Sequence, residues 1–351
     1  MIRYEPGMRV SEYVLEERIG AGTFGEVWRA RHHVWASEYV AVKLPTEPEY
    51  VRYLQREGAV VHGLKHANIV RVTGFDPFAE HPYLIMELIC GPSLRQVISE
   101  HPKGLPIAAT VTILRGILGA MDAAHAASVL HRDLKPGNVL LNLGDRPLEQ
   151  VAVDDIKVGD FGLGVENAET LRSIVQSASL ARDDQLVGTL AYMAPELRDG
   201  QLKPSPRSDL YSVGVILFEM LTGERPAGAE LPSTIRADTP PALDHVFRRL
   251  YTRYETRYES ARAALDDLSA RLATARPGMP PPPPPSTVVA PAAATRLHTC
   301  PSCRQVVAEE DQFCTQCGQQ LVAQVRRCPA CHGYPSLYDR YCIFCGAALT
   351  A

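Results

Sequence analysis

The sequence predicts an α+β fold of two lobes, the first rich in β-strands and the second rich in α-helices, followed by small metal-binding hairpins. Residues 26–31 and 40–44 follow the period of two that is typical of strands, next to a cluster of glycines. Residues 108–128 and 210–221 are apolar stretches of helical length. Four C-x-x-C pairs follow residue 299, a spacing that favours metal binding over disulfides in a reducing compartment.

Length and composition limit the class of protein. With 351 residues the chain exceeds one ordinary domain, so a large two-lobed domain with an appendage, or two domains, is expected. The net charge of −4 gives no global attraction for nucleic acid or for an anionic membrane. No run approaches the ~18 apolar residues of a membrane span, and the opening MIRYEPGMRV lacks the apolar core of a leader. We therefore expect a soluble, cytoplasmic protein with no membrane partner.

Composition also divides the chain into three parts. We expect a globular domain over residues 13–272, a proline- and alanine-rich linker over 273–296 and a cysteine-rich tail over 297–351. The linker contains six consecutive prolines, which cannot form a helix or a central strand and extend as polyproline II at ~3.1 Å per residue. A semi-rigid spacer is the preferred interpretation, and a ligand for a proline-binding partner is the alternative.

Near its start the globular domain carries a glycine-rich segment, Gly20-Ala21-Gly22-Thr23-Phe24-Gly25-Glu26-Val27. The G-x-G-x-x-G pattern alone is a weak signal, because dinucleotide-binding units also carry it, but in those units a helix follows directly. Here a strand-like pattern follows, so we expect the loop to lie between two strands. Such a loop can close over nucleotide phosphates, since glycines let backbone N–H groups approach the phosphate oxygens.

Lys43 shares one face of the strand 40–44 with Ala41. On the strand alone, a solvated lysine would be the simpler interpretation. The following helix changes this balance, because Glu57 falls in the middle of the apolar arc formed within residues 51–64. A carboxylate on an apolar face is costly unless it is paired, so we expect an ion pair between Glu57 and Lys43.

Two polar turns carry most of the chemistry. The segment His131-Arg132-Asp133-Leu134-Lys135-Pro136-Gly137-Asn138 precedes Asp160-Phe161-Gly162, which places an acid, a lysine and two metal-binding oxygens at spacings of 2, 3 and 22 residues. With Lys43 and Glu57 upstream, the series resembles the catalytic core of eukaryotic-like (Hanks-type) serine/threonine protein kinases. The resemblance covers about three quarters of the chain. It implies a two-lobed protein-kinase-like fold and phosphate transfer from Mg-ATP to protein hydroxyls.

The resemblance implies catalytic roles for six residues. Asp133 would accept or orient the proton of the substrate hydroxyl, and Lys135 would neutralise charge on the γ-phosphate. Asn138 and Asp160 would hold Mg²⁺ through hard oxygen ligands. Lys43, held by Glu57, would bind the α and β phosphates.

The resemblance also implies an ATP site around the strand 83–88. Met86 would lie at the back of the adenine pocket, and the backbone of Glu87 and Ile89 would bond the base. Cys90, just beyond them, is expected to be a small buried residue. The remaining ATP-binding residues would be Gly20, Ala21, Gly22, Thr23, Phe24, Gly25, Val27, Ala41 and Lys43.

The nature of the acceptor follows from two further features. Lysine at position 135 resembles the serine/threonine kinases rather than the tyrosine kinases. The block 188–196 resembles the floor on which a peptide substrate lies, with Thr189 near the catalytic residues, and kinase-like small-molecule phosphotransferases generally lack it. In this picture Asp209 would anchor the catalytic loop, and Glu196 would pair with Arg257.

Two segments depart from the minimal family pattern. Residues 142–155 are extra and are expected to form a longer surface hairpin, with its acidic residues solvated rather than metal-bound. The segment 160–196 is rich in hydroxyls, and Arg132 is placed to bind a phosphorylated residue of that segment. We hypothesise activation by autophosphorylation at one or more of Thr170, Ser173, Ser177 and Ser179.

The tail is an internal duplication with a period of 28 residues, 297–323 and 325–351. Each half provides two C-x-x-C turns, which suit one closed, tetrahedral, structural Zn²⁺ site. The tail resembles a double zinc ribbon. Its two predicted zinc sites are formed by Cys300, Cys303, Cys314 and Cys317, and by Cys328, Cys331, Cys342 and Cys345.

The tail carries no strongly basic surface in sequence, so a protein-docking or regulatory role is favoured over nucleic-acid binding. Two functional alternatives remain open at this point. One is a non-catalytic scaffold whose kinase-like fold only binds nucleotide. The other is a nucleic-acid-binding zinc-ribbon protein that its kinase-like domain regulates.

Overall fold

The computed structural model describes residues 3–22, 25–47, 50–51, 54–55, 58, 63–161 and 190–274 of the long N-terminal part. In the tail it describes residues 297–304, 306–308, 312–314, 317, 319–329, 334 and 348–349. The chain forms two compact units, residues 1–276 and residues 277–351.

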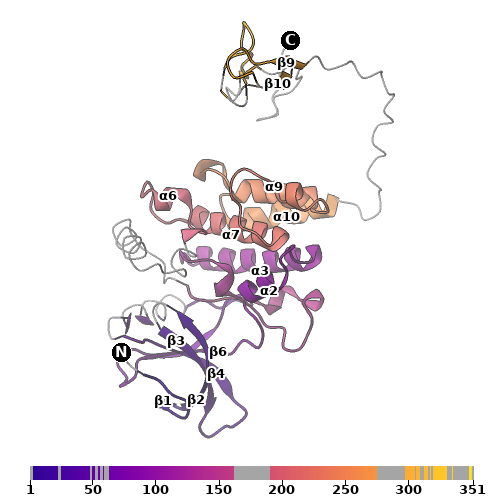
Figure 1. Cartoon of the computed structure of the whole chain (residues 1–351). Helices are drawn as coiled ribbons and strands as arrows, with labels where there is room; N and C mark the ends of the chain where they lie inside the picture. Colours follow the sequence, from indigo (N-terminus) through magenta and orange to yellow (C-terminus); the bar gives the residue numbers. More distant parts are fainter. Residues whose placement is uncertain are drawn as a thin grey trace. The chain divides into compact units, whose positions relative to one another are not determined.

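The N-terminal lobe is built on one antiparallel sheet with the strand order β1-β2-β3-β4-β6-β5 (Figure 1). Its apolar core includes Leu15, Trp28, Val42 and Leu44, which project from three neighbouring strands. Tyr4 joins this core and donates a hydrogen bond to the Pro45 carbonyl at 2.9 Å, so the lobe extends N-terminal to its sheet. The strands are β1 (Arg9–Val10), β2 (Tyr13–Gly22), β3 (Gly25–His32), β4 (Tyr39–Leu44), β5 (Val72–Asp76) and β6 (Tyr83–Glu87).

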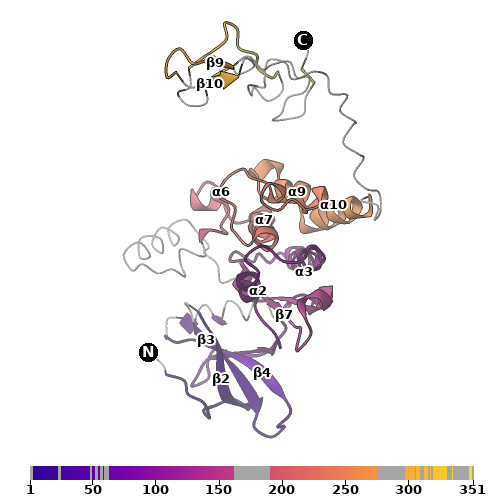
Figure 2. The ribbon, with the colours of Figure 1, turned by 45° about the vertical axis from the view of Figure 1, so that its right-hand side comes forward.

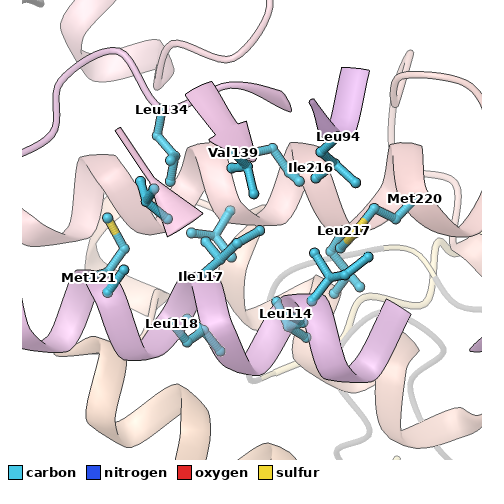
Figure 3. Close-up of a cluster of buried hydrophobic side chains, with 14 of the residues drawn as sticks. Leu94, Leu114, Ile117, Leu118, Met121, Leu134, Val139, Ile216, Leu217 and Met220 are labelled. Carbon is cyan, nitrogen blue, oxygen red and sulfur yellow. The ribbon is translucent and has the colours of Figure 1, made fainter. Parts of the chain in front are cut away.

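The C-terminal lobe is helical, and helices α3 and α7 lie side by side at its centre (Figures 1 and 2). Figure 3 shows Ile117 and Met121 of α3 facing the same core as Ile216 and Leu217 of α7. The two predicted apolar helices are thus confirmed. The helices are α2 (Leu94–Glu100), α3 (Ile107–Ala126), α6 (Pro195–Arg198), α7 (Pro206–Thr222), α8 (Pro232–Ile235), α9 (Pro241–Leu250) and α10 (Ala261–Thr274).

Helix α3 is the one described helix that is long and apolar enough to cross a bilayer. More than half of its most apolar window is buried inside the protein, where it contacts α7 and α10. Its apolar side chains are therefore accounted for by the core of the lobe.

A small hairpin, β7 (Val139–Leu141) and β8 (Ile156–Val158), lies against α2 and α3 (Figure 2). It pairs in antiparallel register, with Leu140 opposite Lys157. The extra residues 142–155 connect the two strands and include the short 3₁₀ helices η3 (Leu148–Gln150) and η4 (Val153–Asp155). The expected longer hairpin is confirmed, and Asp155 pairs with Arg146 at 2.6 Å.

In the described part of the tail, β9 (Leu297–Thr299) and β10 (Val306–Ala308) form an antiparallel pair. Two further 3₁₀ turns, η2 (Pro136–Asn138) and η5 (Tyr254–Thr256), lie in the C-terminal lobe.

A buried ion pair joins helix α6 to the segment that precedes α10. Glu196 accepts two hydrogen bonds from Arg257, at 2.6 and 2.8 Å, and Arg257 is 1% exposed. The predicted pair is confirmed. Burial alone would raise the pKa of Glu196, but the hydrogen bonds from Arg257 outweigh it and hold that pKa below its ordinary value.

We predict that Arg257→Met destabilises the protein by about 3–5 kcal/mol, because it leaves a buried carboxylate without its cation. A Glu196→Leu/Arg257→Met double variant should regain much of that loss, since it buries no unpaired charge. Urea unfolding at pH 7 measures both. Equal stability of Arg257→Met and the wild type would contradict the prediction.

The same pair makes stability depend on pH. Because the folded-state pKa of Glu196 lies below the unfolded value of ~4.3, its contribution is complete above that value and is lost as pH falls through the folded pKa. The free energy of unfolding should therefore fall more steeply below pH ~4 in the wild type than in the double variant.

Candidate active site

Asp209, in the first turn of α7, holds the polar loop 131–138 in place through hydrogen bonds. One carboxylate oxygen, Oδ1, accepts the Arg132 backbone N–H at 2.9 Å. The other, Oδ2, accepts the His131 backbone N–H at 2.9 Å and lies 2.8 Å from His125 Nε2. Burial would raise the pKa of Asp209, but these donors keep that pKa below its usual range and the group ionised. The expected anchoring role of Asp209 is confirmed.

His131 connects this loop to the turn at Asp160. Its ring is fully buried and packs 4.7 Å from the ring of Phe161. Nε2 lies 3.0 Å from the Gly159 carbonyl, and Nδ1 lies 3.4 Å from the backbone N–H of Asp133. This arrangement requires a neutral ring that donates through Nε2 and accepts through Nδ1. Burial lowers the pKa of His131, which agrees with that neutral form.

Asp133 has one engaged oxygen and one open oxygen. Oδ2 accepts from Lys135 Nζ at 2.9 Å and from Asn138 Nδ2 at 3.3 Å, and Nδ2 also donates to the Asp133 carbonyl at 2.8 Å. Oδ1 is buried and has no hydrogen-bond partner within the described residues. A buried carboxylate oxygen without a partner, in a loop that is held in place, can readily accept a hydroxyl proton.

Asn138 and Asp160 lie beside each other because they flank the antiparallel strands β7 and β8. The Gly159 backbone N–H donates to the Asn138 carbonyl at 2.9 Å, which fixes this junction. Since the Asn138 amide nitrogen is used by Asp133, its side-chain oxygen remains for a ligand. That oxygen and the Asp160 carboxylate are the hard donors that Mg²⁺ prefers, so these residues fit the metal.

Lys43 reaches Asp160 across the two lobes. Nζ lies 2.7 Å from Asp160 Oδ1, and Lys43 is 8% exposed. Burial would raise the pKa of Asp160, but Lys43, with a smaller effect of Lys135, holds that pKa below its ordinary value. The expected partner of Lys43, Glu57, lies outside the described residues, so that pair stays a prediction.

Asp160 also has a left-handed backbone, with φ at 59°, as has Arg132, with φ at 67°. Non-glycine residues in this region cost on the order of 1–3 kcal/mol each and persist only where the surroundings impose them. Arg132 directly precedes Asp133, and Asp160 is itself a candidate metal ligand.

The residues expected around adenine share one apolar cluster. Val27, Ala41, Met86 and Ile89 pack together with Leu140 of β7. The β2–β3 hairpin that carries the glycines is confirmed, with Gly22 paired opposite Gly25, and Thr23 and Phe24 lie outside the described residues. Gly20 and Ala21 lie on β2 opposite Val27 and Glu26.

At the end of β6 the backbone N–H of Glu87 is bonded to the Arg71 carbonyl at 2.9 Å, so only its carbonyl is left for a base. Cys90 is exposed, which corrects the expectation that it is buried, because the segment leaving β6 runs along the protein surface.

Tyr192 and Met193, from the predicted substrate floor, lie next to Asp133. A small pocket is lined by Arg132, Asp133 and Leu134 on one side and by Tyr192, Met193 and Ser212 on the other. The Tyr192 hydroxyl donates to Glu219, and burial raises the pKa of Tyr192. Arg95 of α2 donates to the same hydroxyl at 2.6 Å and to Glu219 at 3.1 Å. Thr189 and the four candidate phosphorylation residues lie outside the described residues.

Several of these residues are not singled out by sequence. The roles of His125, Leu140 and Arg95 depend on neighbours that are distant along the chain. For His125 a signal exists, since it is a histidine six residues before His131 in an apolar segment.

The first cysteine set in the tail fits a metal. The sulfurs of Cys300, Cys303, Cys314 and Cys317 all lie within 4.8 Å of one another, with Cys300–Cys317 and Cys303–Cys314 separations of 3.6 and 3.5 Å. A tetrahedral Zn–S₄ site with bonds of ~2.3 Å places its sulfurs ~3.8 Å apart, whereas a disulfide requires ~2.05 Å. The backbone N–H of Cys303 lowers the pKa of the Cys300 thiol to about 7, which favours the thiolate. Of the second set, Cys328 is described and buried, and Cys331, Cys342 and Cys345 lie outside the described residues.

Comparison with known families agrees with this geometry. Residues 13–278 match the model of the protein kinase domain. The chain belongs to the protein kinase family. Residues 300–346 of this kinase match the model of the double zinc ribbon.

Among relatives, the kinase is 36% identical over 233 residues to the serine/threonine-protein kinase PkaA of Streptomyces coelicolor, covering 62% of this chain and 40% of PkaA. It is 34% identical over 228 residues to the serine/threonine-protein kinase PknL of Mycobacterium tuberculosis, covering 63% of this chain and 52% of PknL. The chain thus spans about half the length of these curated relatives.

The crystal structure of the Mycobacterium tuberculosis PknI kinase domain superposes with a TM-score of 0.57 at 23% identity, covering 77% of this chain and 100% of that kinase-domain chain. This likeness confirms the expected fold class, with a β-rich N-terminal lobe and an α-rich C-terminal lobe.

We predict that the purified 351-residue chain carries two zinc ions. Cys314→Ser should lower the content to about one, because a site that has lost one of its four thiolates binds zinc far more weakly. Cys90→Ser, a thiol outside the tail, should keep both ions. Elemental analysis after desalting makes the comparison, and one ion or none in the wild type, or two in Cys314→Ser, would contradict the double site.

Proposed function

We propose that this chain is a serine/threonine protein kinase that transfers the γ-phosphate of Mg-ATP to serine or threonine hydroxyls of proteins. The observation that carries the proposal is the open Oδ1 of Asp133, whose other carboxylate oxygen is held by Lys135 and Asn138. A scaffold that only bound nucleotide would not need that oxygen. In this kinase it lies beside a lysine and next to Tyr192 and Met193 of the predicted substrate floor.

Asp133 is proposed to act through Oδ1. Because Lys135 and Asn138 hold Oδ2, the carboxylate cannot rotate freely, and Oδ1 would accept the hydrogen of the substrate hydroxyl as its oxygen attacks the γ-phosphorus. Lys135 lies within bonding distance of Asp133 and would face the charge that develops on the γ-phosphate. The hydroxyl oxygen would form a bond to the γ-phosphorus while its proton passes to Asp133. The bond from the γ-phosphorus to the β-phosphate oxygen would break, with ADP as the leaving group.

Asn138 and Asp160 are proposed to hold Mg²⁺, which, when bound, neutralises charge on the nucleotide phosphates. Lys43 now shares its charge with Asp160 at 2.7 Å. When nucleotide and metal bind, Lys43 would pair with an α- or β-phosphate and Asp160 would bind the metal. Each residue of the ion pair would thus gain a stronger partner. Glu57 is proposed to hold Lys43 in that arrangement.

The ATP site is proposed to lie in the apolar cluster between the lobes. Ala41, Met86 and Leu140 would enclose the base, and the Glu87 carbonyl and the Ile89 N–H would bond its edge. The β2–β3 loop would cover the phosphates through the backbone N–H groups of Gly20 to Gly25.

Activation is proposed to involve autophosphorylation at one or more of Thr170, Ser173, Ser177 and Ser179, with Arg132 as the cation that binds the phosphate. The domain limits are proposed as 13–272 for the kinase domain, 273–296 for the linker and 297–351 for the ribbons. The proposed location is the cytoplasm, where C-x-x-C thiols remain reduced and bind metal.

The tail is proposed to dock a protein. Residues 297–351 contain four arginines, Arg304, Arg326, Arg327 and Arg340, and four acidic residues, Glu309, Glu310, Asp311 and Asp339. These charges cancel over the tail as a whole, so it has no net positive charge to attract nucleic-acid phosphates.

Incubation of the purified protein with radiolabelled Mg-ATP and a serine-rich protein substrate tests the proposal. Asp133→Asn should lower phosphate transfer about 10²–10⁴-fold, the usual contribution of a general base. Asp266→Asn, an exposed acid on α10, should leave it unchanged. Mass spectrometry of the wild-type protein locates the autophosphorylated residues. Equal transfer by the wild type and Asp133→Asn would rule out the role of Asp133, and no transfer by either would favour the scaffold.

A further inference from the structure

The segment between the lobes, residues 88–93, is bonded to the β7–β8 hairpin at several points. The backbone N–H of Cys90 donates to Asn142 Oδ1 at 3.1 Å, and the Cys90 carbonyl accepts the Gly144 N–H at 2.7 Å. Although Cys90 is exposed, both of its backbone groups are therefore satisfied by protein rather than by water. We call residues 88–93 the hinge segment.

The far end of the hinge segment is held by β7 itself. The Leu141 N–H donates to the Pro92 carbonyl at 3.0 Å, and Ser93 forms an isolated bridge with Leu140. Gly91 passes so close to β7 that an added Cβ would overlap the Leu141 carbonyl oxygen. Only glycine permits this approach.

The near end of the hinge segment is held by β8. Lys157 Nζ lies 3.1 and 3.4 Å from the two carboxylate oxygens of Glu87, the last residue of β6. The Arg71 backbone N–H donates to the same carboxylate at 2.8 Å. The backbone carbonyl of Glu87 is proposed to bond adenine. Its side chain is held by Lys157 and by the Arg71 N–H, which lie outside the proposed nucleotide site.

The hairpin that makes these bonds is itself stiffened by its extra residues. Arg146 donates to Asp155 at 2.6 Å and to the Asn142 carbonyl at 3.0 Å, which closes the base of the insertion. Asp155 also accepts the Ala152 N–H at 2.8 Å. From the other side, the buried Asn68 side chain donates to the Ile156 carbonyl at 2.9 Å. These bonds stiffen the insertion 142–155, whose first residue is Asn142.

We infer that the β7–β8 hairpin, through Asn142 and Lys157, is a brace that holds the hinge segment in the conformation that binds adenine. The inference rests on the proposed function, because the hinge backbone is assigned there to the base. A segment that is held in one conformation binds its ligand more tightly than one that must be ordered first, since the apparent affinity scales with the competent fraction. Asn142 contacts Cys90 of the hinge segment, and Lys157 contacts Glu87, the residue directly before it. Both are therefore positioning residues, which are not assigned to contact the nucleotide.

The test measures nucleotide binding without phosphate transfer. Mg-ADP is titrated calorimetrically into the full chain and its variants. Asn142→Leu, which has nearly the same shape but no acceptor, should raise Kd about three- to tenfold, the effect of losing one net hydrogen bond. Lys157→Met should do the same from the other end of the hinge segment. Asn142→Asp keeps the accepting oxygen and should bind like the wild type.

Two controls separate a brace from a general loss of structure. Asp145→Asn changes an exposed side chain of the same insertion and should leave Kd unchanged. In Asn142→Leu, amide hydrogen exchange should quicken at Cys90 and Gly144 but not in α3, and the KM for ATP should rise while the KM for the protein substrate stays constant.

The inference is overturned if the wild type binds Mg-ADP and Asn142→Leu binds it equally tightly, or if Asp145→Asn weakens binding as much as Asn142→Leu does. Failure of the wild type itself to bind Mg-ADP would reject the proposed function, and with it the role of the brace.

Discussion

The structure depends on one buried carboxylate, that of Asp209. It receives the backbone N–H groups of His131 and Arg132 and faces His125, so three donors from two segments converge on two oxygens. A buried carboxylate costs several kcal/mol unless its lone pairs are satisfied, and here two of the three donors belong to the loop that carries Asp133. The left-handed backbone of Arg132 is the conformation that this anchoring imposes. Folding of the helical lobe thus determines where Asp133 points.

Beyond Asp209, two further acids of the site form ion pairs with lysines. Asp133 pairs with Lys135 at 2.9 Å, and Asp160 pairs with Lys43, which comes from a strand 117 residues earlier. The two acids are connected through the neutral ring of His131, which bonds the Gly159 carbonyl on one side and faces the Asp133 N–H on the other. Both acids are therefore held by a lysine, while Asp133 Oδ1 stays open to a substrate. Groups that are held in place in this way meet the condition for electrostatic catalysis.

Much of this site could be predicted from sequence, for a physical reason. Phosphoryl transfer needs particular residue types, and Asp133, Lys135, Asn138 and Asp160 lie in two short turns whose spacing is visible in the chain. Period and composition likewise predict α3, α7 and the cysteine pairs. What could not be predicted depends on contacts between distant segments. The need of Lys43 for an anion is visible, but its described partner is Asp160. Lys157 and Asn142 look like ordinary surface residues until the fold brings the hinge segment beside them, and Cys90 looks apolar in sequence although the chain there follows the surface.

The central claim is that Asp209 positions the loop for phosphate transfer and not for nucleotide binding. The most direct test is a comparison of kcat with the Kd for Mg-ADP in Asp209→Asn. An asparagine turns one donor toward a backbone N–H, and a displacement of ~1 Å at the reacting groups is worth about 10²-fold in rate. We predict that kcat falls about 10²-fold while Kd stays within about twofold of the wild type in protein that remains folded. An unchanged kcat, or a loss of nucleotide affinity as large as the loss of kcat, would contradict the account.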